Sequence, residues 1–356
     1  MGRKAALLAA CVAVVLCAGV ASAAMPEGAA PPAVLEGGAP AATVQGAAAS
    51  LDVIPAPKQV TPQSGEFALD EFAALLVSDQ ATLGTRSAAR VVQLGIRERF
   101  GLDLPIIRIS QERRHGPRKM IWVVEPRMLR PESGDYHKFI KQPGTLVPHP
   151  PSRTIGVKGL QFTDEMAVEG YFIRVDPIAV VIHGASDAGS YWGAQTLLQL
   201  IRPPRPGSLF RRGRGPTIPC LWMADWPSNR DRVVPPEMKV PAEPDAAEQF
   251  LKLAARYKLN GIARGAVPAD EAVRERLRHV SEYHPVPCVE KFVPLPGDSP
   301  LARLAFEAAA EGRTRFALAA LAEAAWGPPD PEPALFRQRF AREAGEEVPV
   351  PAPPAK

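Results

Sequence analysis

The sequence is poor in cysteine, which excludes a small fold held together by several disulfide bonds. It has four cysteines in 356 residues, and two of them, Cys11 and Cys17, lie in an N-terminal leader. The other two, Cys220 and Cys288, could pair in an exported protein, but one bond is not a disulfide framework. The apolar fraction of 46% is that of an ordinary globular protein.

The sequence also lacks the residue clusters that bind metal ions. Its six histidines are scattered, and His279 and His284 are five residues apart, so they do not share one face of a helix. No His-Glu-x-x-His motif and no Cys/His cluster with zinc spacing occurs. We therefore expect neither a metal site nor a cofactor.

An excess of charge of one sign is absent as well. The formal net charge is only +4, which gives no reason to expect nucleic acid or an anionic membrane as a partner. The arginines between residues 202 and 214 lie among proline and glycine. That setting favours a solvated connector over an anion-binding patch.

No apolar run has the length that is typical of a membrane span. Residues 1–24 instead resemble a secretory signal peptide, because two basic residues precede the apolar run 5–20 and small residues follow up to Ala23. We expect cleavage after about Ala23 and a secreted or periplasmic location. Lipoprotein anchoring at Cys11 is not favoured, because more apolar sequence follows this residue than precedes it.

Proline is abundant, with 40 residues, and much of it lies at the ends of the chain and in connectors. Residues 25–52 consist mainly of Ala, Gly and Pro and have hardly any large apolar side chain. Such a segment cannot offset the entropy of ordering, so we predict a disordered linker. We predict a mobile tail for the Pro-rich residues 346–356.

Residues 53–216 predict an α+β domain, with a small sheet and two helices on one of its faces. Apolar residues recur at every fourth position from Ala88 to Phe100, before Gly101, which indicates an amphipathic helix and its end. A second helix is predicted with Asp187 as its cap. Runs of β-branched and aromatic residues predict strands at 106–109, 121–124, 171–175 and 178–182.

Residues 217–345 predict an incomplete (β/α) barrel-like region. The Ala-rich stretch 301–326 predicts two helices that are separated near Gly312. The preceding part predicts strands at 220–223, 259–262 and 286–290, and helices at 246–257 and 271–283.

Three segments, with an arginine between the second and the third, follow one another in a specific order. They are Gly189-Ser-Tyr-Trp-Gly-Ala-Gln-Thr-Leu-Leu-Gln-Leu-Ile201, then Ile218-Pro-Cys-Leu-Trp-Met-Ala-Asp-Trp-Pro227 with Arg232 five residues later, and finally Tyr257-Lys-Leu-Asn260. In this order and spacing they resemble glycoside hydrolase family 20, the β-N-acetylhexosaminidases. The resemblance implies a zincin-like N-terminal domain and the beginning of a catalytic barrel. Because 96 residues follow Asn260 and a whole barrel takes at least ~200, we expect a truncated, degenerate barrel.

The resemblance implies a catalytic Asp-Glu pair that this sequence does not show in its usual motif. In the family the acetamido group of the substrate attacks the anomeric carbon, the Asp steadies that group, and the Glu protonates the leaving oxygen. No motif like His-x-Gly-Gly-Asp-Glu occurs here. Asp270 and Glu271 are weak catalytic candidates, because acidic residues at the start of a helix are explained by the helix dipole. The pair at 164–165 favours a turn.

Two residues are candidates for sugar binding. Arg232 matches, in type and in its distance from Pro227, the family's arginine that grips sugar hydroxyls with a bidentate contact. The alternative for Arg232 is a surface arginine without a ligand. Trp226 could stack on a sugar ring.

The expected function is that of a secreted, β-N-acetylhexosaminidase-like protein of carbohydrate metabolism. It would lack the catalytic pair and bind N-acetylhexosamine glycans at most, which makes it a pseudoenzyme. Two alternatives stay open. One is an active hydrolase whose site is rearranged or completed in a homo-oligomer, and the other is an interaction module that docks a partner enzyme.

Overall fold

The structure of this chain is a computed structural model that describes residues 51–111, 119–124, 162–204, 215–281, 284, 286, 288–289, 299–327 and 332–344. All of them belong to one unit of the chain, Pro40–Lys356. The predicted signal peptide, nearly all of the predicted linker, and the tail lie outside the described residues. None of the described helices is both long enough and apolar enough to span a membrane.

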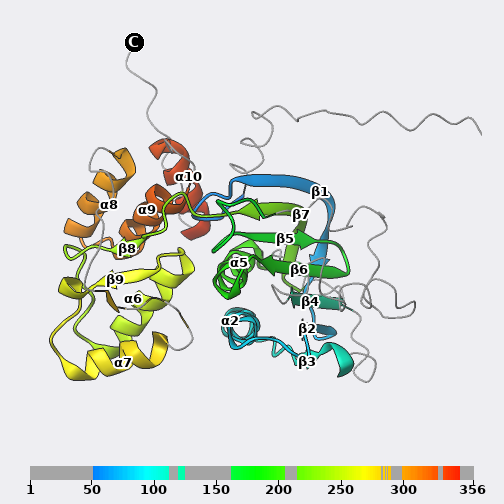
Figure 1. The fold of residues 1–356 in the computed structure, drawn as a ribbon. Helices are drawn as coiled ribbons and strands as arrows, with labels where there is room; N and C mark the ends of the chain where they lie inside the picture. The colour runs from blue at the N-terminus through cyan, green and yellow to red at the C-terminus, as the bar shows by residue number, and fades with distance from the viewer. Residues whose placement is uncertain are drawn as a thin grey trace, which may run out of the picture. The chain divides into compact units, whose positions relative to one another are not determined.

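A seven-stranded mixed sheet is built from the first part of the chain (Figure 1). Its strand order is β1-β7-β5-β6-β4-β2-β3. The pairs among β6, β4, β2 and β3 are parallel, and those among β1, β7, β5 and β6 are antiparallel. The strands are β1 (Gln59–Ala68), β2 (Ala73–Val77), β3 (Ile106–Arg108), β4 (Lys119–Val124), β5 (Tyr171–Val175), β6 (Ala179–Gly184) and β7 (Thr217–Asp225).

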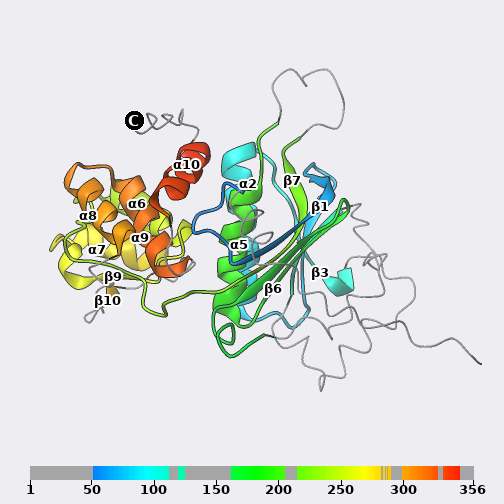
Figure 2. The same cartoon turned by 90° about the horizontal axis from the view of Figure 1, so that it is seen from above.

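Two helices, α2 (Leu83–Phe100) and α5 (Asp187–Leu200), lie on the same face of this sheet (Figure 2). Their apolar sides and the facing strand residues form the main core, in which Leu75, Ile173 and Trp192 are buried. Full burial of one such side chain stabilises the fold by about 1.5–3 kcal/mol. The helices therefore hold the sheet through the hydrophobic effect, as the sequence pattern predicts.

The helix caps confirm one sequence prediction and correct another. Gly101 adopts a left-handed conformation (φ 71°) and donates its backbone N–H to the carbonyl of Arg97, which ends α2 as predicted. The cap of α5 is Ser186 rather than Asp187, because the Ser186 hydroxyl accepts hydrogen bonds from two backbone N–H groups of the first turn. Asp187 is the first residue of α5, and its carboxylate accepts a hydrogen bond from the Thr82 hydroxyl at the start of α2.

The opposite face of the sheet carries a buried histidine between aromatic rings. His183 is 4% exposed, and its ring centroid lies 4.9 Å from that of Phe162 and 6.3 Å from that of Phe172. Neither ring nitrogen of His183 has a hydrogen-bond partner among the described residues. Burial lowers the pKa of His183 to about 3, because the charged imidazolium would lose its hydration there.

This histidine should make the protein less stable in acid. Between pH 6.5 and 3 the unfolded chain binds a proton at His183 and the folded chain does not, so the free energy of unfolding falls as the pH falls. Protonation of this one group can change the free energy of unfolding by at most about 1.4 kcal/mol per pH unit. Urea unfolding of the wild type and of His183→Phe, at pH 7, 6, 5 and 4.5, measures the contribution of His183 to this pH dependence. The wild type should lose stability relative to the variant below pH 6.5, and a constant difference would contradict the assignment.

The second part of the chain contains a small parallel sheet with the strand order β10-β9-β8. Helices connect its strands, so the described elements alternate β8-α6-β9-α7-β10. The alternation of strands and helices is as the sequence predicts, whereas a barrel-like closure stays an expectation. The elements are β8 (Val233–Val234), α6 (Pro244–Arg256), β9 (Gly261–Ala263), the 3-10 turn η4 (Arg264–Ala266), α7 (Glu271–Ser281) and β10 (Cys288–Val289).

Three further helices follow, α8 (Pro300–Ala310), α9 (Thr314–Trp326) and α10 (Pro333–Ala344). The chain turns between α8 and α9 at Gly312, which has a positive φ of 76°, and this confirms the predicted break. Helix α9 contacts α6, α8 and α10, and its residue Trp326 is fully buried. Helix α10 is not anticipated by the sequence pattern.

Strand β7 corrects the expected placement of residues 220–223. The sequence pattern assigns them to the start of the barrel-like region, but β7 pairs with β1 and β5 inside the seven-stranded sheet. Leu221 and Met223 of β7 lie in the main core, and Ala224 lies in a second apolar cluster with Phe172. A strand with apolar residues on both faces is suited to a position inside a sheet. Cys220 in β7 and Cys288 do not form a disulfide bond with each other.

Candidate functional site

A buried cluster of charged and aromatic side chains lies at the end of β7, and we call it the Asp225 cluster. Asp225, Lys258, Tyr171 and Trp326 are all fully buried. Asp225 Oδ2 accepts hydrogen bonds from Lys258 Nζ (2.8 Å), the Tyr171 hydroxyl (2.7 Å) and Trp326 Nε1 (2.8 Å). Asp225 Oδ1 accepts one from the backbone N–H of Lys58 (3.2 Å). The carboxylate thus joins β5, β7, α9 and the segment that follows α6.

Local backbone geometry places Lys258 in this cluster. Its backbone is left-handed, with φ 64°, just after the α6 cap residue Tyr257, a conformation that costs a residue with a Cβ roughly 1–2 kcal/mol. Lys258 Nζ also donates to the Tyr171 hydroxyl at 2.8 Å. Burial lowers the pKa of Lys258, and the nearby Asp225 carboxylate opposes that shift. Burial raises the pKa of Tyr171, which keeps its phenol protonated as a donor.

Arg232 is beside this cluster and is enclosed by the protein. Its side chain is 0% exposed, and Nε donates to the carbonyl of Lys258 at 2.8 Å. Nη1 donates to the carbonyls of Asn229 (2.9 Å) and Arg230 (3.0 Å), and Nη2 donates to the Glu169 carboxylate. Four of its five N–H groups are therefore used inside the chain.

Two indole rings enclose the same guanidinium group. The Cζ atom of Arg232 lies 4.7 Å from the ring centroid of Trp326 and 5.6 Å from that of Trp192, within the range of cation–π attraction. Burial lowers the pKa of Arg232, and the Glu169 carboxylate opposes this. In this geometry the guanidinium group stabilises the structure and is not open to a sugar.

Asn260 joins two of the segments that carry the family resemblance. Its Oδ1 accepts the backbone N–H of Arg232 at 2.9 Å, and its own backbone N–H donates to the Arg232 carbonyl at 2.9 Å. Asn260 Nδ2 donates to the Arg230 carbonyl at 2.6 Å. The segment before β8 and the Tyr257–Asn260 segment, 25 or more residues apart in the sequence, are thus fixed side by side.

Trp226, the second sugar-binding candidate, belongs to a different cluster. It is half-buried and packs with Met166, Phe172 and Ala224. Trp226 Nε1 donates to the Glu165 carboxylate at 3.1 Å. Arg232 stacks on other tryptophans, so the structure does not combine Arg232 and Trp226 into one sugar platform. Their sugar-binding role stays a prediction.

The weak catalytic candidates lie at the exposed start of α7. Asp270 Oδ1 accepts the backbone N–H of Val273 at 3.1 Å, which is an N-cap contact. Glu271 forms an ion pair with Arg278, in which both side chains are about 70% exposed. The helix-start interpretation of this pair is confirmed. The other acidic pair, Asp164 and Glu165, is exposed in a turn before β5.

The described residues do not form an open acid–base site. Asp225 and Glu323 are fully buried acids, and each is matched by a cation, Lys258 and Arg339. Within the same part of the chain, no three acidic, histidine or cysteine side chains are grouped to hold a metal ion. The arrangement holds secondary-structure elements together.

Sequence reasoning missed Asp225, Lys258, Tyr171 and Glu169. A signal for one of them is present in the sequence, because Asp225 is a charged residue inside the otherwise apolar segment 218–226. A charged residue in such a setting is rarely buried unless it is paired. Lys258, which is flanked by Arg256 and Asn260, and Glu169, which lies in a turn, carry no comparable signal.

Residues 50–226 match the family model described as glycosyl hydrolase family 20, domain 2. The chain belongs to glycoside hydrolase family 20. The matched residues contain the whole seven-stranded sheet with α2 and α5, so β7 is part of the family-20 domain. The Asp225 cluster joins this domain to the elements that follow it.

Solved structures of family-20 enzymes are similar to part of the chain. They include an exo-β-N-acetylglucosaminidase from Vibrio harveyi (15% identity, TM-score 0.39, covering 60% of this chain and 25% of that one). A chitobiase from Flavobacterium johnsoniae has 14% identity and a TM-score of 0.42, covering 67% and 34%. A β-N-acetylhexosaminidase from Streptomyces coelicolor A3(2) has 16% identity and a TM-score of 0.44, covering 65% and 44%. The matches thus span less than half of each of these structures. A comparison with the curated proteins finds no match.

Proposed function

We propose that this chain is an exported, non-catalytic relative of the β-N-acetylhexosaminidases that binds N-acetylhexosamine glycans at most. The observation that carries the proposal is the position of Arg232. This residue matches the family's sugar-gripping arginine, but its guanidinium group is enclosed and bonded to the protein. The placement of Asp270 and Glu271 on an exposed helix start supports the same conclusion.

Hydrolysis of a nitrophenyl β-N-acetylglucosaminide tests this proposal. The full chain should release nitrophenol no faster than the buffer, and Asp270→Asn and Glu271→Gln should give the same background rate. Neither variant should change folding by more than about 2 kcal/mol, because only a cap and an exposed ion pair are altered. Release above background that either substitution abolishes would overturn the proposal.

An active enzyme with a site completed by a second copy is the alternative. Among the described residues β8 and β10 pair only with β9, and an open strand edge can pair with another chain. The same assay separates the two functions. Specific activity that rises with protein concentration would favour the alternative, and background rates at every concentration would favour the non-catalytic relative.

A further inference from the structure

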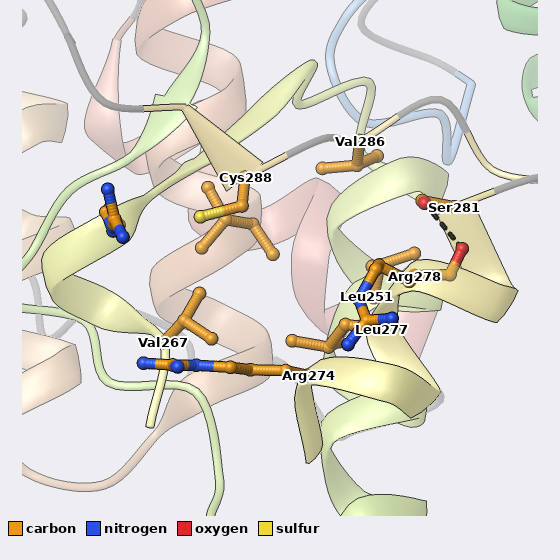
Figure 3. Close-up of a pocket in the computed structure, with 10 residues that line it drawn as sticks. Leu251, Val267, Arg274, Leu277, Arg278, Ser281, Val286 and Cys288 are labelled. Carbon is orange, nitrogen blue, oxygen red and sulfur yellow. Dashed lines mark hydrogen bonds between the residues drawn. The ribbon is translucent and has the colours of Figure 1, made fainter. Parts of the chain in front are cut away.

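A cavity of about 280 Å³ lies between the small parallel sheet and the helices α6 and α7 (Figure 3). Its apolar wall includes Leu251 of α6, Ile262 of β9, Leu277 of α7 and Val286 before β10. The volume is roughly twice that of a cavity that holds benzene and close to the lower end of ligand pockets. A small ligand of roughly ten non-hydrogen atoms would fit.

The charged residues that line the cavity all carry the same sign. They are Arg264, Arg274 and Arg278, and none of the ten lining residues is acidic. In Figure 3, Arg274 lies along one side of the cavity and Cys288 on the other. Three arginine side chains beside an apolar wall complement a ligand with an apolar body and one anionic end.

Among these arginines, Arg274 has the most N–H groups that can donate hydrogen bonds to such a ligand. Its Nε donates to the Pro268 carbonyl at 3.2 Å, which orients the side chain. No partner is recorded for its two terminal nitrogens within the described part of the chain. Arg278 forms an ion pair with the exposed Glu271, and an exposed pair of this kind is weak. A planar guanidinium group with free N–H groups binds a carboxylate through two parallel hydrogen bonds.

We propose that this cavity binds a small amphiphilic monocarboxylate, with its apolar part against Leu251, Ile262 and Leu277 and its carboxylate on Arg274. The site is separate from the Asp225 cluster. It borders the acidic pair at the start of α7, because Arg278 pairs with Glu271, but neither acid takes part in the proposed binding. It is therefore independent of the proposed glycan-related function. The carboxylate chemistry is common to short fatty acids and to alkylated aromatic acids.

Calorimetric titration of the full chain with octanoate and with 4-ethylbenzoate tests the proposal and distinguishes these two sources. At least one of them should bind with a dissociation constant on the order of 0.1 to 1 mM, as expected for a ligand of this size. Octanamide, which has the same chain without the charge, should bind about tenfold more weakly than octanoate if the aliphatic acid is the ligand. No heat from either acid up to 10 mM would overturn the proposal.

Variants locate the binding. Arg274→Gln should weaken carboxylate binding about tenfold, whereas Arg337→Gln, which changes an exposed arginine of α10, should not change it. Leu277→Trp, which would fill the cavity, should abolish binding. If Leu277→Trp does not fold, Arg274→Gln alone decides, since Arg274 is exposed. Equal affinity in the wild type, Arg274→Gln and Arg337→Gln would mean non-specific binding and overturn the proposal.

Cys288 gives an independent readout of the location. Cys288 is an exposed cysteine that lines the cavity, whereas Cys220 is buried. A saturating carboxylate should slow alkylation of Cys288 by iodoacetamide in the wild type, measured on its peptide by mass spectrometry. At the same ligand concentration the protection should largely disappear in Arg274→Gln. Unchanged alkylation at a concentration that saturates the calorimetric signal would place the ligand elsewhere and overturn the proposal.

Discussion

Lys258→Met should destabilise the protein by about 3–5 kcal/mol, the cost of removing one partner from a buried ion pair. The substitution leaves the Asp225 carboxylate buried without its cation, with only the neutral donors Tyr171, Trp326 and the Lys58 backbone. Both residues carry a Cβ, so the left-handed backbone at position 258 costs the same in each. Urea unfolding at pH 7 measures the loss.

Two further variants test whether the unpaired buried charge causes this loss of stability. Lys252→Met removes an ion pair with Glu248 on the surface of α6 and should cost no more than about 0.5 kcal/mol. The double variant Asp225→Asn with Lys258→Met should be more stable than Lys258→Met alone, because the unpaired charge is gone. A double variant as unstable as the sum of its two single changes would show that the charge is not the cause.

Arg232→Lys should cost about 3 kcal/mol, although it keeps the positive charge. A lysine ammonium group cannot reproduce the planar set of bonds to Glu169 and to three backbone carbonyls. It would also lose the stacking on Trp326. The midpoint of thermal unfolding should therefore fall by several degrees.

Arg230→Lys is the matched control for this change. Arg230 is exposed, and the bonds that it accepts from Arg232 and Asn260 go to its backbone carbonyl, so its substitution should leave the unfolding midpoint unchanged. If Arg232 instead binds sugar, Arg232→Lys should leave the midpoint of thermal unfolding unchanged. The variant should then lose the stabilisation that N-acetylglucosamine gives to the wild type. That outcome would contradict the enclosed geometry.

The periodic parts of the fold are the parts that the sequence predicts. The four-residue repeat from Ala88 to Phe100 and Gly101 identify α2 because a helix end is decided by local backbone chemistry. The predicted strands 171–175 and 178–182, which only two residues separate, identify the β5–β6 hairpin in the same way. No strand is predicted at β1, because its apolar residues alternate poorly, and seven of its ten residues are exposed in the structure. Its strand structure depends on a distant partner, β7.

The candidate site shows the limit of sequence reasoning more sharply. The order of Arg232 and Tyr257–Asn260 identifies residues that the structure does bring together. It does not reveal whether the guanidinium group of Arg232 faces a ligand or the interior. That depends on Glu169, Trp192 and Trp326, which lie 63, 40 and 94 residues away in the sequence. Long-range packing of this kind has no local pattern.

The position of β7 between β1 and β5 also sets an order of events during synthesis. Gln59 pairs with Ala224, and β1 has no other neighbour among the strands that the structure describes. At about 5–20 residues per second, β1 would leave the ribosome on the order of ten seconds or more before its partner. During that interval its backbone groups have only water or another chain to bind. A chain released before residue 217 would therefore keep the helices α2 and α5 but leave β1 as a free strand, prone to associate with other copies.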